Sequence, residues 1–338
     1  MRYLVLGAGA LGGYFGGMLI KGGADVTFLV RPKRAAQIQR DGLIVRTQDG
    51  GELRTQAKVV QQGQLDGPFD VILLSCKAYD LDGAMDAIAP AMTKRSIIVP
   101  LLNGVRHIDI LTERFGRGRV LGGLTIINAA LMPDGTIQQS QLRINITMIG
   151  ELDGQLSDRC TAIKTALEAG GISVQVAENI LVMMWEKFFG FACNATIASL
   201  TRSRAGVIAR TIDGAPFVSA VIGECVKVVT ALGYPPLPDF DSAGIITGIF
   251  SQPNSTYGPS LLIDMEDAPK VNTPSAIWQN APRERVLAHH SLPRPDANQS
   301  KQSDFSSRTY GVTDAACRYH EVAGQVQGPL LALFDRSD

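Results

Sequence analysis

Short runs of aliphatic and β-branched residues alternate with longer helical stretches from the first residue to about residue 178. Such alternation is typical of a parallel β-sheet whose strands are joined by crossover helices. Several runs are apolar at nearly every position, which predicts strands that are buried on both faces. The expected strands are Arg2–Leu6, Asp25–Leu29, Val71–Ser75, Ile97–Leu101, Val120–Ile126 and Ser173–Val176.

The pattern changes after residue 178. Two long segments with helical periodicity follow, Leu181–Leu200 and Phe217–Leu232, and they predict an all-helical second domain over residues 179–271. From Asn272 onward, repeated prolines and the almost wholly polar segment Asp296–Arg308 leave no helical period. Residues 272–338 therefore form an anomalous C-terminal stretch of the sequence.

The first expected strand runs directly into a G-x-G-x-x-G motif that leads into a helical stretch. Its first glycine permits a tight turn, its second lets a pyrophosphate approach the backbone, and its third lets the helix pack closely on the strand. Free N–H groups at the start of the helix attract the negative charge. Without a ligand the same residues would be only a glycine-rich turn. Because one strand precedes the motif and another follows it, we expect an α/β domain of the Rossmann type over residues 1–178. Its dinucleotide would be contacted by Gly7, Gly9, Ala10, Leu11 and Gly12.

The second expected strand ends in V-R-P-K-R, which places Arg31, Lys33 and Arg34 where an NAD-binding domain usually carries an acidic residue. An acidic residue there binds the ribose hydroxyls, whereas a basic residue accommodates a 2′-phosphate. The sequence therefore favours NADP as the cofactor, with Arg31 as the expected ligand of the phosphate. The alternative is that these residues are solvated surface charges.

Composition narrows the range of partners. Lys and Arg total 32, as do Asp and Glu, so the net charge gives no bias toward nucleic acid or membranes, and a small-molecule partner is expected.

The glycines from Gly7 onward interrupt the apolar N-terminus, which argues against a signal peptide or membrane anchor. The cysteines are too scattered for a disulfide framework or a zinc site, so we expect no metal and a cytoplasmic protein with reduced thiols. They are Cys76, Cys160, Cys193, Cys225 and Cys317.

Four polar residues are candidates for chemistry. Lys77 and Asn103 each follow an expected strand end, the edge where parallel sheets bind ligands, although both could be ordinary loop residues. Lys187 and Asn194 are seven residues apart on one face of an otherwise apolar helix. An ammonium facing a cleft can stabilise the oxyanion that forms during ketone reduction and can supply the proton. A lysine on such a helix can equally extend to solvent.

Four motifs together resemble the ketopantoate reductase family, also called 2-dehydropantoate 2-reductases. They are G-A-G-A-L-G, S-C-K-A-Y-D, L-L-N-G-V and W-E-K, and the resemblance covers residues 1–271. It implies NADPH-dependent reduction of 2-dehydropantoate to pantoate in pantothenate and coenzyme A biosynthesis. By the same resemblance Lys187 is the catalytic lysine, Asn103 lies near nicotinamide and substrate, and Lys77 belongs to the cofactor cleft. Ser260, within G-P-S-L-L-I-D, matches the serine that binds the substrate carboxylate, and Asn194 matches a family asparagine.

The chain also departs from the family pattern. Phe191 stands four residues after Lys187, where well-studied members carry asparagine, and Asn272 stands where the family has glutamate. A related 2-keto acid reductase with another substrate, or a non-catalytic NADP-binding protein, are therefore alternatives. The expected partner is a small 2-keto acid, and a homodimer is considered as the assembly.

The anomalous stretch has a specific candidate explanation, a shifted reading frame. Permitted codons for Lys270 to Leu292, read from one nucleotide earlier, allow G-E-H-P-I-G-D-L-A-E-R-A-A-R-A-G-V-G-A-P-L-L, which resembles the family's ending and restores its glutamate. The alternatives are disorder and a genuinely divergent C-terminus. On the shifted-frame hypothesis, we expect weak or absent turnover with NADPH binding largely retained. Sequencing the coding DNA tests the hypothesis, because codons incompatible with that string would end it.

Overall fold

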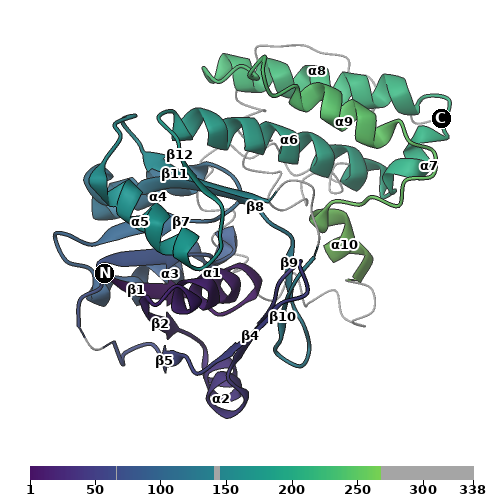
Figure 1. Cartoon of the computed structure of the whole chain (residues 1–338). Coiled ribbons are helices and arrows are strands. Elements are labelled where there is room, and N and C mark those ends of the chain that lie inside the picture. Colours follow the sequence, from purple (N-terminus) through teal and green to yellow (C-terminus); the bar gives the residue numbers. More distant parts are fainter. Residues whose placement is uncertain (66, 141–144, 268–338) are drawn as a thin grey trace, which may run out of the picture. The chain divides into compact units, whose positions relative to one another are not determined.

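The computed structural model describes residues 1–65, 67–140 and 145–267, and these form two compact units divided after Trp185 (Figure 1). The division falls within a long helix, α6 (Ile180–Thr201), shortly after the domain boundary that the sequence predicts. The anomalous stretch 272–338 lies outside the described residues.

A five-stranded parallel sheet is the framework of the first unit. Its order is β5-β2-β1-β6-β7, so the first strand lies centrally, between β2 and β6. The buried apolar positions that predicted these strands face packed helices on both sides of the sheet. Two of the expected strands are confirmed to the residue and two end one residue earlier than expected. The strands are β1 (Arg2–Leu6), β2 (Asp25–Leu29), β5 (Lys58–Val60), β6 (Val71–Leu74) and β7 (Ile97–Pro100).

Two smaller sheets accompany it, with the orders β4-β3-β10-β9 and β12-β11-β8. Both contain antiparallel pairs beside the predicted parallel sheet. Short hairpin connections join β3 to β4 and β9 to β10, and such connections permit only antiparallel pairing. The strands are β3 (Leu43–Arg46), β4 (Glu52–Thr55), β8 (Leu121–Ile126), β9 (Ala129–Leu131), β10 (Ile137–Gln139), β11 (Ile146–Glu151) and β12 (Val174–Val176).

Helices cover these sheets. The first of them, α1, is rich in glycine because Cβ atoms at Gly13, Gly16 and Gly17 would meet the side chains of Ile137, Phe28 and Val45. This close approach packs α1 tightly between the strands around it (Figure 1). The helices are α1 (Ala10–Lys21), α2 (Pro32–Asp41), α3 (Leu81–Ile88), α4 (Arg106–Phe115) and α5 (Asp158–Ala169), with short 3-10 turns η1 (Ala78–Asp80), η2 (Ala89–Ala91) and η3 (Arg117–Arg119).

The described part of the second unit is helical, as the sequence predicts. Besides α6 it contains α7 (Ala205–Ala209), α8 (Gly214–Ala231), α9 (Ser242–Phe250) and α10 (Ser260–Asp267). Among the described residues, α6 and α8 are long and apolar enough to cross a membrane by length and composition alone. Core helices of soluble proteins meet the same two criteria, so this is weak evidence for a membrane span.

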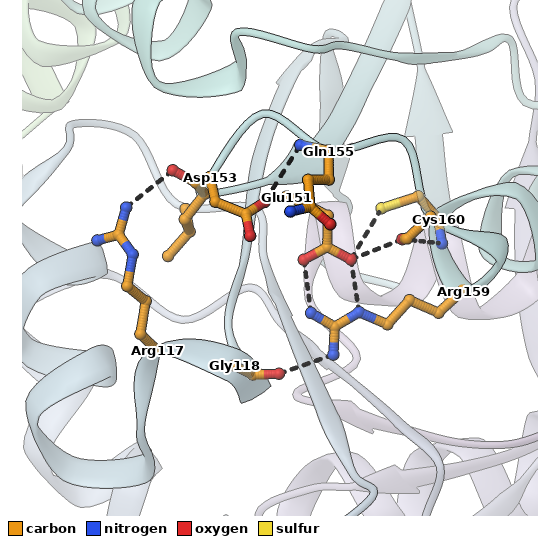
Figure 2. A network of polar contacts seen from close by, with 9 residues as sticks. Arg117, Gly118, Glu151, Asp153, Gln155, Arg159 and Cys160 are labelled. Atoms are coloured by element: carbon orange, nitrogen blue, oxygen red, sulfur yellow. Dashed lines mark hydrogen bonds and ion pairs between the residues drawn. The ribbon is translucent and has the colours of Figure 1, made fainter.

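The buried carboxylate of Glu151, the last residue of β11, forms a network of hydrogen bonds with neighbouring segments (Figure 2). Glu151 accepts two hydrogen bonds from Arg159, at 2.6 and 2.5 Å, and a third from the hydroxyl of Ser157 at 2.6 Å. The same guanidinium donates to the carbonyl of Gly118 at 2.7 Å, so it links the start of α5 to η3. Arg159 and Ser157 hold the pKa of Glu151 below its usual value.

Replacing this carboxylate is expected to destabilise the protein. For Glu151→Gln we expect a loss of about 2 kcal/mol in the free energy of unfolding at pH 7, because charge-assisted hydrogen bonds are lost at a buried site. The pKa of Glu151 is lower in the folded protein than in the unfolded chain, so its ionised carboxylate stabilises the folded state at neutral pH. This stabilisation is lost as the pH falls through the folded-state pKa. The difference from wild type should therefore shrink in acid. Denaturant unfolding at several pH values measures it.

The matched control is Glu52→Gln, which removes a carboxylate from an exposed ion pair with Arg46 at 2.9 Å. Its cost should stay within about 0.5 kcal/mol. Equal effects of the two substitutions would contradict a special role for Glu151.

Candidate active site

Four parallel strands of the first unit end at the same level. Leu6 of β1 is in register with Leu29 of β2 and Leu74 of β6, and Leu74 is in register with Pro100 of β7. The segments that follow these strands therefore leave the sheet along one edge, the carboxyl edge at which open α/β sheets bind ligands. The predicted cofactor residues on these segments are Gly7, Gly9, Ala10, Leu11, Gly12, Arg31, Lys77 and Asn103.

The glycine-rich loop has the geometry of a phosphate cradle. Gly7 adopts a φ of +83°, which favours glycine, and its N–H donates to the carbonyl of Leu29 at 2.9 Å. A Cβ at Gly12 would collide with the carbonyl oxygen of Gly7 and the hydroxyl of Ser75. A Cβ at Gly9, directly before α1, would have no heavy atom within 4 Å. The open space over Gly9 and the start of α1 fits a pyrophosphate approaching the backbone.

Lys77 and Asn103 are both exposed at this edge. Lys77 directly precedes η1, and Asn103 lies between β7 and α4. Gly104 has a φ of +90°, and the Asn-Gly pair lies in a bend of the connecting loop, which is compatible with the ordinary-loop alternative. The structure thus places both residues on the sheet edge from which the phosphate loop also leaves, and their contacts with a ligand stay predictions.

The three basic residues after β2 have different environments. Arg31 directly precedes α2, is largely exposed, and forms an ion pair with Asp80 of η1 at 3.2 Å. Lys33 is exposed, as a solvated surface charge would be. Arg34, in contrast, is partly buried, so the interpretation of this residue as a solvated surface charge was wrong.

Arg34 holds the phosphate loop in place. Its Nε donates to the carbonyl of Ala8 at 2.9 Å, and its Nη1 donates to the carbonyl of Gly135 at 2.9 Å and to Gln37 at 2.8 Å. Gly135 lies in the turn between β9 and β10, where it needs a φ of +89°. The guanidinium therefore connects the loop to a hairpin whose Gly135 is 101 residues from Arg34 in the chain. Sequence reasoning missed this role because nothing in the local motif identifies a partner so distant in the chain.

In the second unit, Lys187 lies on α6 and is partly buried. Burial lowers the pKa of Lys187 from its usual value to about 8. The side chain is still mostly an ammonium at neutral pH, yet it releases its proton far more readily than an exposed lysine. A pKa close to the working pH is what general acid catalysis requires.

Asn194 shares the helical face of Lys187, two turns further along α6. Its amide nitrogen donates to the carbonyl of Gly190 at 2.8 Å, while its oxygen is buried and has no hydrogen-bond partner among the described residues. Phe191 lies between them in sequence and is partly buried. Ser260 is the first residue of α10, and its side chain lies outside the described part of the structure.

Sequence reasoning also missed Glu186, the neighbour of Lys187. Its carboxylate is buried and accepts hydrogen bonds from the backbone of Leu237, at 2.8 Å, and from the hydroxyl of Ser242. These two hydrogen bonds link the segment between α8 and α9, and the start of α9, to the part of α6 that carries Lys187. A glutamate on an apolar helix was the available signal, because such a residue is rarely buried unless it is paired.

Comparison with known proteins assigns both domains to one family. A family model described as "Ketopantoate reductase PanE/ApbA" matches residues 3–154, and its C-terminal counterpart matches residues 179–274. The second match ends close to the position where the anomalous stretch begins. An uncharacterized oxidoreductase of Bacillus subtilis (strain 168), YkpB, is 33% identical over 267 residues, covering 79% of this chain and 86% of the relative.

Solved structures share the fold. A 2-dehydropantoate 2-reductase from Geobacter metallireducens GS-15 superposes with a TM-score of 0.70 at 23% identity, covering 79% of this chain and 88% of the other. A D-mandelate dehydrogenase in complex with NADH and anilino(oxo)acetate superposes with a TM-score of 0.67 at 22% identity, covering 79% and 86%. The chain therefore belongs to the ketopantoate reductase PanE/ApbA family of oxidoreductases, whose members bind NADH or NADPH through a Rossmann fold.

Proposed function

We propose that this protein is a cytoplasmic enzyme that reduces 2-dehydropantoate to pantoate with NADPH, a step of pantothenate and coenzyme A biosynthesis. The observation that carries the proposal is the register of β1, β2, β6 and β7, which brings the phosphate loop, Arg31, Lys77 and Asn103 to one edge. The family model supports the substrate class. The partly buried Lys187 supports the reaction type, because its lowered pKa suits a proton donor.

The bound cofactor would supply a hydride to C2 of the keto acid. As negative charge forms on the carbonyl oxygen, the ammonium of Lys187 stabilises it and transfers a proton to it, giving the alcohol. The neutral amine then regains a proton from solvent. Asn103 orients the reacting groups, Ser260 binds the substrate carboxylate, and Asn194 provides a polar group on the helical face of Lys187.

A second candidate is the reduction of another small 2-keto acid. It is favoured by Phe191, which replaces a polar residue with an apolar one on the helix that carries Lys187. Such a change favours a substrate whose branch is more apolar than that of 2-dehydropantoate.

The test is oxidation of NADPH, followed by its absorbance, with enzyme and cofactor at equal concentrations so that a slow single turnover is still detected. Candidate substrates are 2-dehydropantoate and a panel of 2-keto acids with aliphatic and aromatic branches. We expect the fastest oxidation with 2-dehydropantoate, whereas a faster reaction with an apolar keto acid favours the second candidate. Quenching of cofactor fluorescence without oxidation by any keto acid would contradict both and favour a non-catalytic binding protein.

A further inference from the structure

The basic residues after β2 are not equivalent as ligands for a cofactor phosphate. The Nε and Nη1 groups of Arg34 are engaged with the carbonyls of Ala8 and Gly135, and its Nη2 is buried. Arg31 is different, because 85% of its side chain is exposed. Of these two guanidinium groups, Arg31 is therefore the one that a ligand can reach.

Arg31 already contacts a carboxylate. Its Nη2 lies 3.2 Å from Oδ2 of Asp80, whose side chain is 42% exposed. The strands that lead to these residues, β2 and β6, are separated by β1, so their ends are about 10 Å apart. The ion pair therefore joins the segments that follow the two strands flanking β1, the strand that leads into the phosphate loop. This places Asp80 next to the position at the end of the second strand where the 2′-substituent of the adenosine ribose is recognised.

The two side chains have opposite preferences at that position. A guanidinium binds a 2′-phosphate, whereas a carboxylate accepts hydrogen bonds from ribose hydroxyls and repels a phosphate. An exposed ion pair contributes at most about 1 kcal/mol, so a ligand can replace it. Resting on the proposed function as a nicotinamide-dependent reductase, we propose that Asp80 is a specificity-determining residue. It weakens the preference of Arg31 for NADPH, so that the chain also binds NADH.

The test measures dissociation constants for NADPH and NADH by fluorescence titration of the full chain and of Asp80→Asn. The substitution removes the negative charge without changing the shape of the side chain. We expect NADPH to bind about tenfold more tightly, because a repulsion between the carboxylate and a phosphate at a few ångströms is lost. NADH binding should stay unchanged or weaken. The gain for NADPH should shrink as KCl is raised, since salt screens exposed charges.

The matched control is Asp86→Asn, which also removes a carboxylate from an exposed ion pair, with Arg114 at 2.7 Å, on α3 of the same unit. It should leave both dissociation constants unchanged. Equal shifts for the two cofactors in Asp80→Asn, or no shift, would overturn the role of Asp80 while leaving the reductase proposal intact. Failure of the wild-type chain to bind either cofactor would overturn the proposed function, and this inference with it.

Discussion

Replacing Lys187 with methionine is expected to lower the rate of keto acid reduction by at least about 100-fold, the usual contribution of a general acid. Methionine fills a similar volume on α6 but can neither donate a proton nor stabilise an oxyanion. The dissociation constant of NADPH should change little, because the expected cofactor ligands lie on the sheet edge of the first unit. Single-turnover oxidation of NADPH and a fluorescence titration measure the two quantities.

The control is Lys227→Met, which removes a more exposed lysine from another apolar helix of the same unit, α8. It should retain wild-type reduction. Equal rates in wild type and Lys187→Met would show that Lys187 only extends to solvent, as the alternative from the sequence holds.

The same lysine predicts a pH dependence. Burial lowers its pKa to about 8, and the protonated form is the one that donates. The value of kcat/KM for reduction should therefore be constant on the acidic side of pH 8 and fall on the alkaline side, as the ammonium is lost. A profile that rises with pH through this range would indicate that Lys187 acts as a base or takes no part.

The second large effect concerns two glycines of the phosphate loop. Gly12→Ala should destabilise the protein by about 1–3 kcal/mol and abolish NADPH binding, because its Cβ collides with the carbonyl of Gly7 and the hydroxyl of Ser75. Backbone has to move to relieve this collision, and the loop moves with it. Thermal unfolding and fluorescence titration report the two losses.

Gly9→Ala is the informative counterpart. Gly9 has a φ of −77°, which alanine adopts readily, and a Cβ there meets no heavy atom within 4 Å. Stability should therefore be retained, whereas the methyl group occupies space needed by the pyrophosphate and should weaken NADPH binding by about tenfold or more. Wild-type affinity in Gly9→Ala would contradict the location of the pyrophosphate.

The parts of this fold that could be predicted from the sequence are those with a local signal. β1 and β2 are apolar runs that are buried on both faces, and a glycine motif follows the first, so their bounds could be predicted to the residue. The strands β3, β4, β5, β9, β10 and β11 were missed. All but β11 are only three or four residues long, which is too short to show a period, and β11 contains a glycine and ends in a glutamate.

The residues of the candidate site also fall into two groups, those in local sequence motifs and those whose roles depend on long-range contacts. The phosphate loop, Lys77, Asn103 and Lys187 belong to contiguous motifs, so the sequence identifies them. The roles of Arg34 and Asp80 depend instead on contacts between segments far apart in the chain, with Gly135 and Arg31 respectively. Such contacts are set by the register of the sheets, and no local pattern of residues encodes them.

The proposed reaction requires that a dinucleotide bound at the carboxyl edge of the sheet and the ammonium of Lys187 act on the same carbon. A crystal structure of the chain with NADP and 2-dehydropantoate tests this requirement. We expect a pyrophosphate over Gly9 and the Nζ of Lys187 at about 3 Å from the oxygen on C2 of the substrate. A structure with the ammonium in bulk solvent, far from the nicotinamide, would contradict it.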